Sequence, residues 1–385
     1  MQKTTNFKPI LNRVMTVKEI TTILEDLAPL NYAEDFDNVG LLVGDYHAEV
    51  TGVLFTLDTL ESVVGEAIKE KCNLIVSFHP IIFSGLKKIT GATYVERVIL
   101  KAIKNDIAIY AIHTALDNSV KGVSAKMAEV LALQNTRILL PKSRLIKKLT
   151  TYVPNNDADK VRRALFDAGA GVIGNYENCS YNMRGLGTYL GNEQSNPVIG
   201  KRGVLQQENE TYISVIFEKH LESNVLKALF DSHPYEEVAY EIVTTDNSHQ
   251  NIGMGMTGYL SSPQDELDFL NLVKQKFNLK CIRHSNLLGK KIEKVAVLGG
   301  SGSFAIDAAK QAGADIYLTA DIKYHEFYKS ENQMVIADIG HYESEQFTKN
   351  ILADHLIKKI RNFAPAFAKG NIVLSKQNTN PINYF

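Results

Sequence analysis

The chain has 385 residues, 45% of them hydrophobic and 22% charged, so it can bury more than one core and does not have the composition of a disordered protein. Its 42 Lys and Arg residues nearly balance its 43 Asp and Glu residues, which argues against a surface that holds nucleic acid or an anionic membrane by charge alone. The three cysteines form no Cys-x-x-Cys pair, and no stretch approaches the ~18 consecutive apolar residues of a membrane span, so we expect a cytoplasmic protein without a thiolate zinc site.

The N-terminal part of the chain predicts an α/β lobe over residues 15–145. A polar arm of about a dozen residues comes first, and an apolar pattern at helical spacing runs from Thr16 to Leu27. Three apolar strands, "VTGVLFTLD", "NLIVSFHP" and "IAIYAIHTALD", then alternate with helices in "ESVVGEAIKEKC" and "TYVERVILKAIKND". This alternation is typical of βαβ units, in which helices cover both faces of a parallel sheet.

The same alternation returns over residues 259–385, where "KVAVLGGSGS", "DIYLTAD" and "QMVIADIGHYESE" are predicted strands that lead into helices. Residues 146–258, between the two lobes, follow the order βαββαβ, which is the order of a ferredoxin-like fold. We therefore predict the α/β class, with two α/β lobes packed together as one composite domain and an inserted ferredoxin-like domain.

Polar side chains gather where the predicted parallel strands end. These strand-end residues are His79, His113, Asp117, Thr319, Asp321, Asp338, His341 and Glu345. Ligands of open parallel sheets bind beyond the carboxyl ends of the strands, and His with Asp and Glu is the donor set of a nitrogen and oxygen metal site. The sequence therefore predicts a metal site at this edge.

Each signal also has a simpler structural interpretation. A histidine such as His79 often only closes a strand through a hydrogen bond, and Asp117 can cap the helix that follows it. The spacing of four between His341 and Glu345 is a stronger signal, because it places both side chains on one face of a helix. His325, in "TADIKYHE", is either a pocket residue or a surface charge.

Two glycine-rich segments and a second His-Pro pair complete the candidate features. The turn "GGSGS" comprises Gly299, Gly300, Ser301, Gly302 and Ser303. Its amides precede a predicted helix and can cradle an anion, although a tight strand-to-helix turn explains them equally well. The segment "GMGMTG" has the spacing G-x-G-x-x-G, but it does not open a helix after a strand, so it predicts no nucleotide site. The His-Pro in "SHPYEEVAYEI" is more typical of a turn than of a catalytic group.

Together, the motifs "YAEDFDNVGLLVGD", "SFHPIIFSGLKKI", "HTALD", "GGSGS", "TADIKYHE" and "DIGHYESE" resemble, in order and spacing, the dinuclear metal-centre family of GTP cyclohydrolase 1 type 2 homologues. The resemblance covers nearly the whole chain from Met15 onward and extends to the longer members with a PII/CutA-like insertion. It implies a toroidal homohexamer, with metal sites that face an internal cavity.

The resemblance also implies a set of ligands. In the family, a His-His pair after the second strand, the Asp of H-T-x-L-D and the His and Glu of G-H-x-x-S-E hold two ions. The matching positions here are Phe78 and His79, Asp117, and His341 and Glu345. Because phenylalanine cannot coordinate a metal, we expect one firmly held ion per chain. The second site is then weak or empty, or it is completed by water, His113 or a neighbouring carboxylate.

The function that these motifs favour is metal-dependent hydrolysis of a nucleotide-like or phosphorylated small molecule. His113 or His325 is the expected proton carrier, because imidazole titrates near neutral pH. The alternatives are a non-enzymatic regulatory protein that binds a small molecule and a protein that handles metal ions. The donor types are compatible with Zn, Fe, Mn and Mg.

Overall fold

The computed structural model describes residues 14–362 and 364–385, and the polar N-terminal arm expected from the sequence lies outside them. The chain divides into two compact units. The first comprises residues 14–141 and the described residues from Gln250 onward, and the second is Lys142–His249. The mixed α/β architecture with several sheets agrees with the predicted class. None of the helices in the described residues combines the length and hydropathy needed to cross a membrane.

The first unit contains a five-stranded sheet in the order β17-β4-β5-β6-β2. Its strands are β2 (Gly40–Val43), β4 (Val53–Thr56), β5 (Leu74–Ser77), β6 (Ala108–Ala111) and β17 (Ile372–Leu374). All neighbours are parallel except β2, which is antiparallel to β6. Every residue of β4, β5 and β6 is buried, as expected for strands with helices on both faces. Because β17 comes from near the end of the chain, the C-terminal segment completes the N-terminal sheet.

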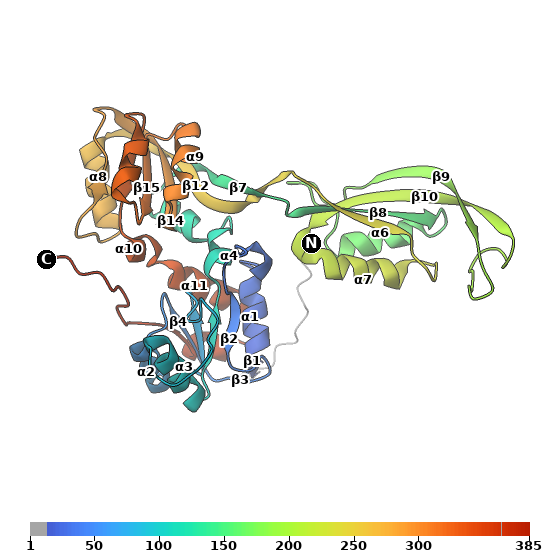
Figure 1. Ribbon diagram of the computed structural model, residues 1–385, viewed down its shortest axis with the longest axis horizontal. Helices are drawn as coiled ribbons and strands as arrows, with labels where there is room; N and C mark the ends of the chain where they lie inside the picture. The colour runs from blue at the N-terminus through green and yellow to red at the C-terminus, as the bar shows by residue number, and fades with distance from the viewer. Residues whose placement is uncertain (1–13, 363) are drawn as a thin grey trace. The chain divides into compact units, whose positions relative to one another are not determined.

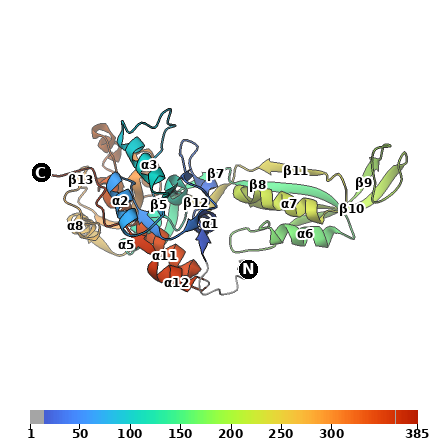
Figure 2. The same cartoon turned by 90° about the horizontal axis from the view of Figure 1, so that it is seen from below.

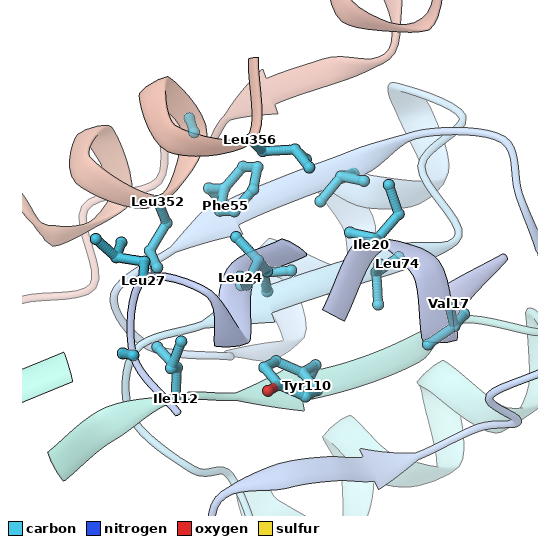
Figure 3. Packing of buried hydrophobic residues seen from close by; sticks show 14 of the residues in the cluster. Val17, Ile20, Leu24, Leu27, Phe55, Leu74, Tyr110, Ile112, Leu352 and Leu356 are labelled. Atoms are coloured by element: carbon cyan, nitrogen blue, oxygen red, sulfur yellow. The ribbon is translucent and has the colours of Figure 1, made fainter. Parts of the chain in front are cut away.

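Helices from both ends of the chain cover this sheet. Helix α1 (Val17–Glu25) is preceded by its N-cap Thr16, whose side chain forms a capping box with Glu19. On the same face as α1 lies α11 (Thr348–Ile360), and Figure 3 shows leucines of both helices beside Phe55 of β4. Helices α2 (Glu61–Lys69) and α3 (Tyr94–Lys104) bury the opposite face. Two antiparallel pieces, β1 (Met15–Thr16) and β3 (Glu49–Val50), and the helix α12 (Pro365–Gly370) complete this part.

The second sheet of this unit has the order β13-β16-β15-β14-β12-β7. Its strands are β7 (Gln134–Ser143), β12 (Ser248–Asp265), β13 (Arg283–His284), β14 (Lys291–Ser301), β15 (Ile316–Ala320) and β16 (Val335–Asp338). Strands β14, β15 and β16 are parallel, as the sequence predicted. The surrounding helices are α5 (Val123–Val130), α8 (Glu266–Lys276) and α9 (Ile306–Gln311). The segment "GMGMTG" lies inside β12, so its glycine spacing belongs to a strand and not to a nucleotide-binding turn.

The second unit has the element order β8, α6, β9, β10, α7, β11. The bounds are β8 (Ile146–Pro154), α6 (Ala158–Asp167), β9 (Tyr181–Leu190), β10 (Leu205–Glu218), α7 (Glu222–Ser232) and β11 (Tyr240–Thr244). The strands form one antiparallel sheet in the order β11-β8-β10-β9. Both helices lie on the same face of this sheet (Figures 1 and 2), where they enclose a core of their own around Leu149, Val161 and Val225.

Candidate metal centre

The registers of the two parallel sheets bring the polar strand ends together. In the first sheet Thr56 pairs with Ser77 and Ser77 with Ala111, so Asp58, His79 and His113 follow three neighbouring strands. In the second sheet, Thr319 pairs with Asp338, so Asp321 follows β15 beside the segment in which α10 (His341–Glu345) begins. The carboxyl ends of both sheets therefore supply the residues of one site.

Three ligand atoms converge in this site. Nε2 of His79 lies 3.4 Å from Nε2 of His341, and each of these nitrogens lies 3.1 Å from Oε2 of Glu345. Ligands that bind one ion at ~2.0–2.1 Å in tetrahedral geometry lie roughly 3.3–3.4 Å apart. The spacing of the three atoms thus fits a single divalent cation, and the His-His-Glu group can bind a metal ion.

A carboxylate fixes the orientation of each of the two imidazoles. Nδ1 of His79 lies 2.8 Å from Oδ1 of Asp58, and Nδ1 of His341 lies 2.7 Å from Oδ2 of Asp321. Because Nδ1–H donates to the carboxylate, Nε2 is the nitrogen left for an ion, as is usual for histidines that bind metals. The sequence indicated Asp321 only as a strand-end residue, and no pattern in it indicated Asp58.

Glu345 supplies the third ligand atom from a buried position. The residue is 3% exposed, and within the described part of the chain its Oε2 accepts no hydrogen bond of good geometry, although both Nε2 atoms lie close. A buried carboxylate oxygen in this position needs positive charge beside it, either from the two imidazoles when they are protonated or from a bound cation. The chemistry of the site therefore fits a metal ion.

The glycine turn before α9 makes room for Glu345. Gly300 has φ +70°, and a Cβ at this position would lie 2.3 Å from Oε1 of Glu345. Its amide N–H donates to Oγ of Ser344 at 2.9 Å, so this amide already has a partner. A Cβ at Gly299 would lie 2.5 Å from Cγ1 of Val123. An anion cradle formed by Gly299–Ser303 stays a prediction, and the observed contacts tie Gly300 to the Glu345 side chain.

The charges of the ligand residues favour a cation. Burial lowers the pKa of His79, but Asp58 and Glu345 outweigh it and raise this pKa to about 9. In His341, burial is outweighed in the same way by Asp321 and Glu345. Burial raises the pKa of Glu345, but His341 and His79 together lower it to about 2. Without an ion, the imidazoles of His79 and His341 are therefore protonated and carry the positive charge. An ion that binds here has to displace these protons.

Asp117 is the fourth residue for which ligation was predicted. It is the last residue of α4 (His113–Asp117) and is half-buried. Burial raises its pKa well above the usual value and the charge of Glu345 raises it further, whereas His79 and His341 act in the opposite direction. Asp117 therefore lies within electrostatic reach of the three convergent residues, and a bound cation would favour its ionised form.

His113 is held by a buried aspartate. Nδ1 of His113 lies 2.8 Å from Oδ1 of Asp37, whose side chain is fully buried and also accepts hydrogen bonds from the backbone N–H and the hydroxyl of Thr114. Burial raises the pKa of Asp37, but its bonds to His113 and Thr114 lower it to about 2. His113 has φ 22°, a strained value for a histidine, and its ring centre lies 5.2 Å from that of His79. No pattern in the sequence indicated a role for Asp37.

Phe78 and His325 differ sharply in their surroundings. Phe78 is fully buried, and its ring centre lies 4.9 Å from that of His79 and 5.5 Å from that of His113. It therefore forms an apolar wall beside both imidazoles.

His325 is exposed, and its ring contacts Tyr324 and Tyr328 instead of the convergent residues. Its predicted catalytic role stays a prediction.

Comparisons with known proteins agree over nearly the full length. A family model described as Duf34/NIF3 (NGG1p interacting factor 3) matches residues 15–381. The chain is 36% identical over 370 residues to a Bacillus subtilis (strain 168) protein named GTP cyclohydrolase 1 type 2 homolog, which covers 95% of this chain and 98% of the relative. A relative of the same name from Halalkalibacterium halodurans is 36% identical over 374 residues, or 97% of this chain and 100% of the relative. The crystal structure of a Bacillus cereus protein related to NIF3 superimposes with a TM-score of 0.83 at 37% identity, covering 97% of this chain and 100% of that one.

Proposed function

The chain belongs to the Duf34/NIF3 family, in agreement with the resemblance of its motifs, and on this premise we propose that it is a metal-dependent hydrolase of a nucleotide-like or phosphorylated small molecule. The observation that carries the proposal is the convergence of three ligand atoms from His79, His341 and Glu345. A structural role alone would not require two histidines, each oriented by its own carboxylate, around one buried carboxylate oxygen.

His79, His341 and Glu345 would hold the ion, with Asp117 as a further candidate ligand. A divalent ion in this place supplies Lewis acidity and lowers the pKa of a water molecule that it binds. The nitrogen and oxygen donors suit Zn, Fe, Mn or Mg, and availability of the ion would decide among them. The ordered carboxylates behind the two histidines hold the ligand geometry in place before the ion arrives.

His113 would carry the proton. Asp37 binds its Nδ1–H, which leaves Nε2 as the atom that accepts or gives a proton near the convergent ligands. Because the Asp37 side chain is buried and receives two further hydrogen bonds from Thr114, the imidazole is held in one orientation. A fixed base of this kind is what general acid–base catalysis requires.

Two exposed aromatic residues support a substrate with a flat ring. Phe36 and Phe83 are 67% and 51% exposed, and their ring centres lie 6.5 Å apart. The centre of the Phe83 ring lies 6.4 Å from that of His113. The two loops are joined by Asn38, whose Nδ2 donates to the carbonyl oxygen of Ile82 at 2.5 Å. Aromatic side chains of this kind stack on the rings of bases.

We also propose that the insertion expected over residues 146–258 contains a ferredoxin-like domain, which is formed by β8 to β11 of the second unit, whereas the residues from Gln250 onward belong to the first unit. The element order βαββαβ and the antiparallel strand order β11-β8-β10-β9 support this assignment, as do two helices on one face of the sheet. From the resemblance of the motifs alone, we further propose a toroidal hexamer in the cytoplasm.

The test of the hydrolase proposal is a turnover screen with protein loaded separately with each candidate ion. Nucleotides, phosphoesters and cyclic amides are the substrates, and turnover is measured with and without a chelator. Glu345→Ala should lose both the ion and turnover, whereas His113→Gln should lose turnover and keep the ion. His47→Gln, at an exposed histidine outside the site, is the control and should change neither. Tight binding of one compound by the fully loaded protein, without turnover, would favour the regulatory alternative.

A further inference from the structure

The second unit carries a cavity on the face of its sheet that its helices leave free. On β10, the side chains of Ile213, Val215 and Phe217 face the core beneath α6 and α7. Side chains alternate between the two faces of a strand. Glu210 and Tyr212 therefore lie on the opposite face, where the cavity has a volume of about 720 Å³. This volume lies within the roughly 300–1,000 Å³ of small-molecule sites.

Four tyrosines line this cavity. Tyr152 of β8 and Tyr212 of β10 occupy paired positions, with ring centres 5.6 Å apart. The rings of Tyr189 and Tyr235 form a second pair, with centres 6.0 Å apart. Tyrosine faces carry negative charge and attract cations, including organic ammonium groups.

A buried carboxylate lies among these rings. Glu210 is 9% exposed, and Oη of Tyr235 donates to its Oε1 at 2.7 Å. Within the described residues, this is the one hydrogen bond to the Glu210 carboxylate. A Cβ at Gly187 of β9 would lie 2.1 Å from Oε2 of Glu210, so this position has to be a glycine to leave room for the carboxylate. A buried carboxylate with a single hydrogen bond is stabilised by a cation.

His233, the histidine of the second His-Pro pair, positions Tyr235 in the wall of the cavity. Nδ1 of His233 accepts a hydrogen bond from the N–H of Tyr235 at 3.1 Å, so its proton lies on Nε2, which donates to the carbonyl oxygen of Tyr152 at 3.0 Å. The turn thereby fixes Tyr235 against Glu210. Next to it, Oε1 of Glu236 accepts from the N–H of Asn196 at 2.6 Å, which holds the loop after β9 beside the cavity.

The charge of the lining selects the class of ligand. Glu210, Glu236 and Glu237 contribute three carboxylates, and Arg184 is the single cationic residue among the lining residues. An anionic ligand would meet net repulsion, and a neutral one would leave the Glu210 carboxylate without a counter-charge. We propose that this cavity is a binding site for an organic cation, a protonated amine on an apolar or aromatic body, which pairs with Glu210 between the tyrosine rings.

The test compares three probes of nearly equal shape on the full-length protein by titration calorimetry. The probes are benzylammonium, benzyl alcohol and benzoate, which differ mainly in charge. Benzylammonium should bind at least about tenfold more tightly than benzyl alcohol, since a hydrogen bond to a charged group is worth ~1.5–3 kcal/mol, and benzoate should bind most weakly. Equal binding of all three probes, or no binding of benzylammonium at 10 mM, roughly the weak limit for so small a ligand, would overturn the proposal.

Variants identify the residues that recognise the positive charge of the ligand. Glu210→Gln keeps an acceptor for Tyr235 and should lower benzylammonium affinity about tenfold while benzyl alcohol affinity stays unchanged. Tyr212→Ala should weaken both probes. Glu208→Gln is the matched control, because Glu208 lies on the same strand and face but does not line the cavity, and it should lower benzylammonium affinity much less than Glu210→Gln does. Unchanged benzylammonium affinity in Glu210→Gln would contradict the proposal.

A second copy of the chain is the competing occupant of this face. Leu186, which lines the cavity and is 59% exposed, is replaced by Glu to break such a contact. If the wild type binds no probe, and Leu186→Glu both dissociates an oligomer and gains binding, the cavity is covered by another chain and the proposal is wrong. If the wild type binds benzylammonium without a change of mass in light scattering, the proposal is supported.

Discussion

Asp58 and His79 follow neighbouring parallel strands, and Oδ1 of the aspartate lies 2.8 Å from Nδ1 of the histidine. The other carboxylate oxygen of Asp58 accepts a hydrogen bond from the hydroxyl of Thr379 at 2.6 Å. The aspartate is therefore fixed on both sides, and the ring of His79 is fixed with it. Asp58 therefore influences the affinity for a metal ion through the orientation of the His79 ring.

Replacing Asp58 should weaken metal binding without removing a ligand. Asp58→Ala should lower the affinity for the ion about 10- to 100-fold, the usual effect of losing a carboxylate behind a metal-bound histidine. Asp58→Asn keeps an acceptor for Nδ1–H and should have a smaller effect. Affinity is measured by competition with a chromogenic chelator, and Asp26→Ala, which removes an exposed ion pair with Lys359, is the control. Equal affinity in Asp58→Ala and wild type would contradict the proposed ligand role of His79.

Phe78 should limit the number of ions. Its ring is fully buried beside His79 and His113, and it offers no donor atom. We expect one ion per chain that resists mild chelation and a second that is substoichiometric or easily removed, as elemental analysis before and after chelation would show. Phe78→His should increase retention of the second ion and lower stability, because it places a polar ring in the core. Two equally resistant ions in the wild type, or none, would contradict this prediction.

The sequence predicted the edge of the sheets at which the site forms, because parallel strands bring their carboxyl ends to one side. Of the four residues predicted as ligands, the structure brings His79, His341 and Glu345 within one group, and Asp117 lies close to them electrostatically. The spacing of four in α10 was informative, since it depends only on local helix geometry.

The supporting residues were not predictable from local patterns. Asp58 is recognisable only once the pairing of Thr56 with Ser77 is known, because that register places it beside His79. Asp37 meets His113 across 76 positions of the chain. The return of β17 to the first sheet likewise depends on tertiary pairing with β4, which no periodicity of the chain encodes.

The Asp37–His113 pair should make stability depend on acid pH. The folded pKa of Asp37, about 2, lies below the ordinary value of 3.8, so its contribution is complete above pH 3.8 and is lost as the pH falls towards 2. The shift corresponds to about 2 kcal/mol of unfolding free energy. In chelator-treated protein, Asp37→Asn should therefore be less stable than wild type by about this amount at pH 6, and the difference should shrink between pH 4 and 2.

Denaturant unfolding at several pH values measures this difference. Asp35→Asn is the control, because Asp35 is an exposed neighbour in the same loop, and it should leave unfolding unchanged. A difference between wild type and Asp37→Asn that is constant from pH 6 to pH 2 would show that the effect is not one of ionisation.

The proposed hexamer should be visible in the mass of the particle. Light scattering at micromolar concentration should give a mass equal to six chains, and it should do so with and without chelator if the metal sites are not part of the contacts between subunits. A monomer under these conditions would refute the assembly and with it the shared internal cavity.

Gly300 should be essential for metal binding through the position of Glu345. Gly300→Ala places a Cβ 2.3 Å from Oε1 of Glu345 and forces alanine into φ +70°, so the carboxylate has to move away from His79 and His341. The backbone strain alone is ~1–2 kcal/mol. Gly313→Ala is a matched control, because Gly313 has φ +69° but nothing within 4 Å of its added Cβ. Both variants should lose stability through the backbone strain, and only Gly300→Ala should also lose the ion in elemental analysis. Retention of the ion by Gly300→Ala at full stoichiometry would contradict the proposed dependence of metal binding on the space that Gly300 leaves for Glu345.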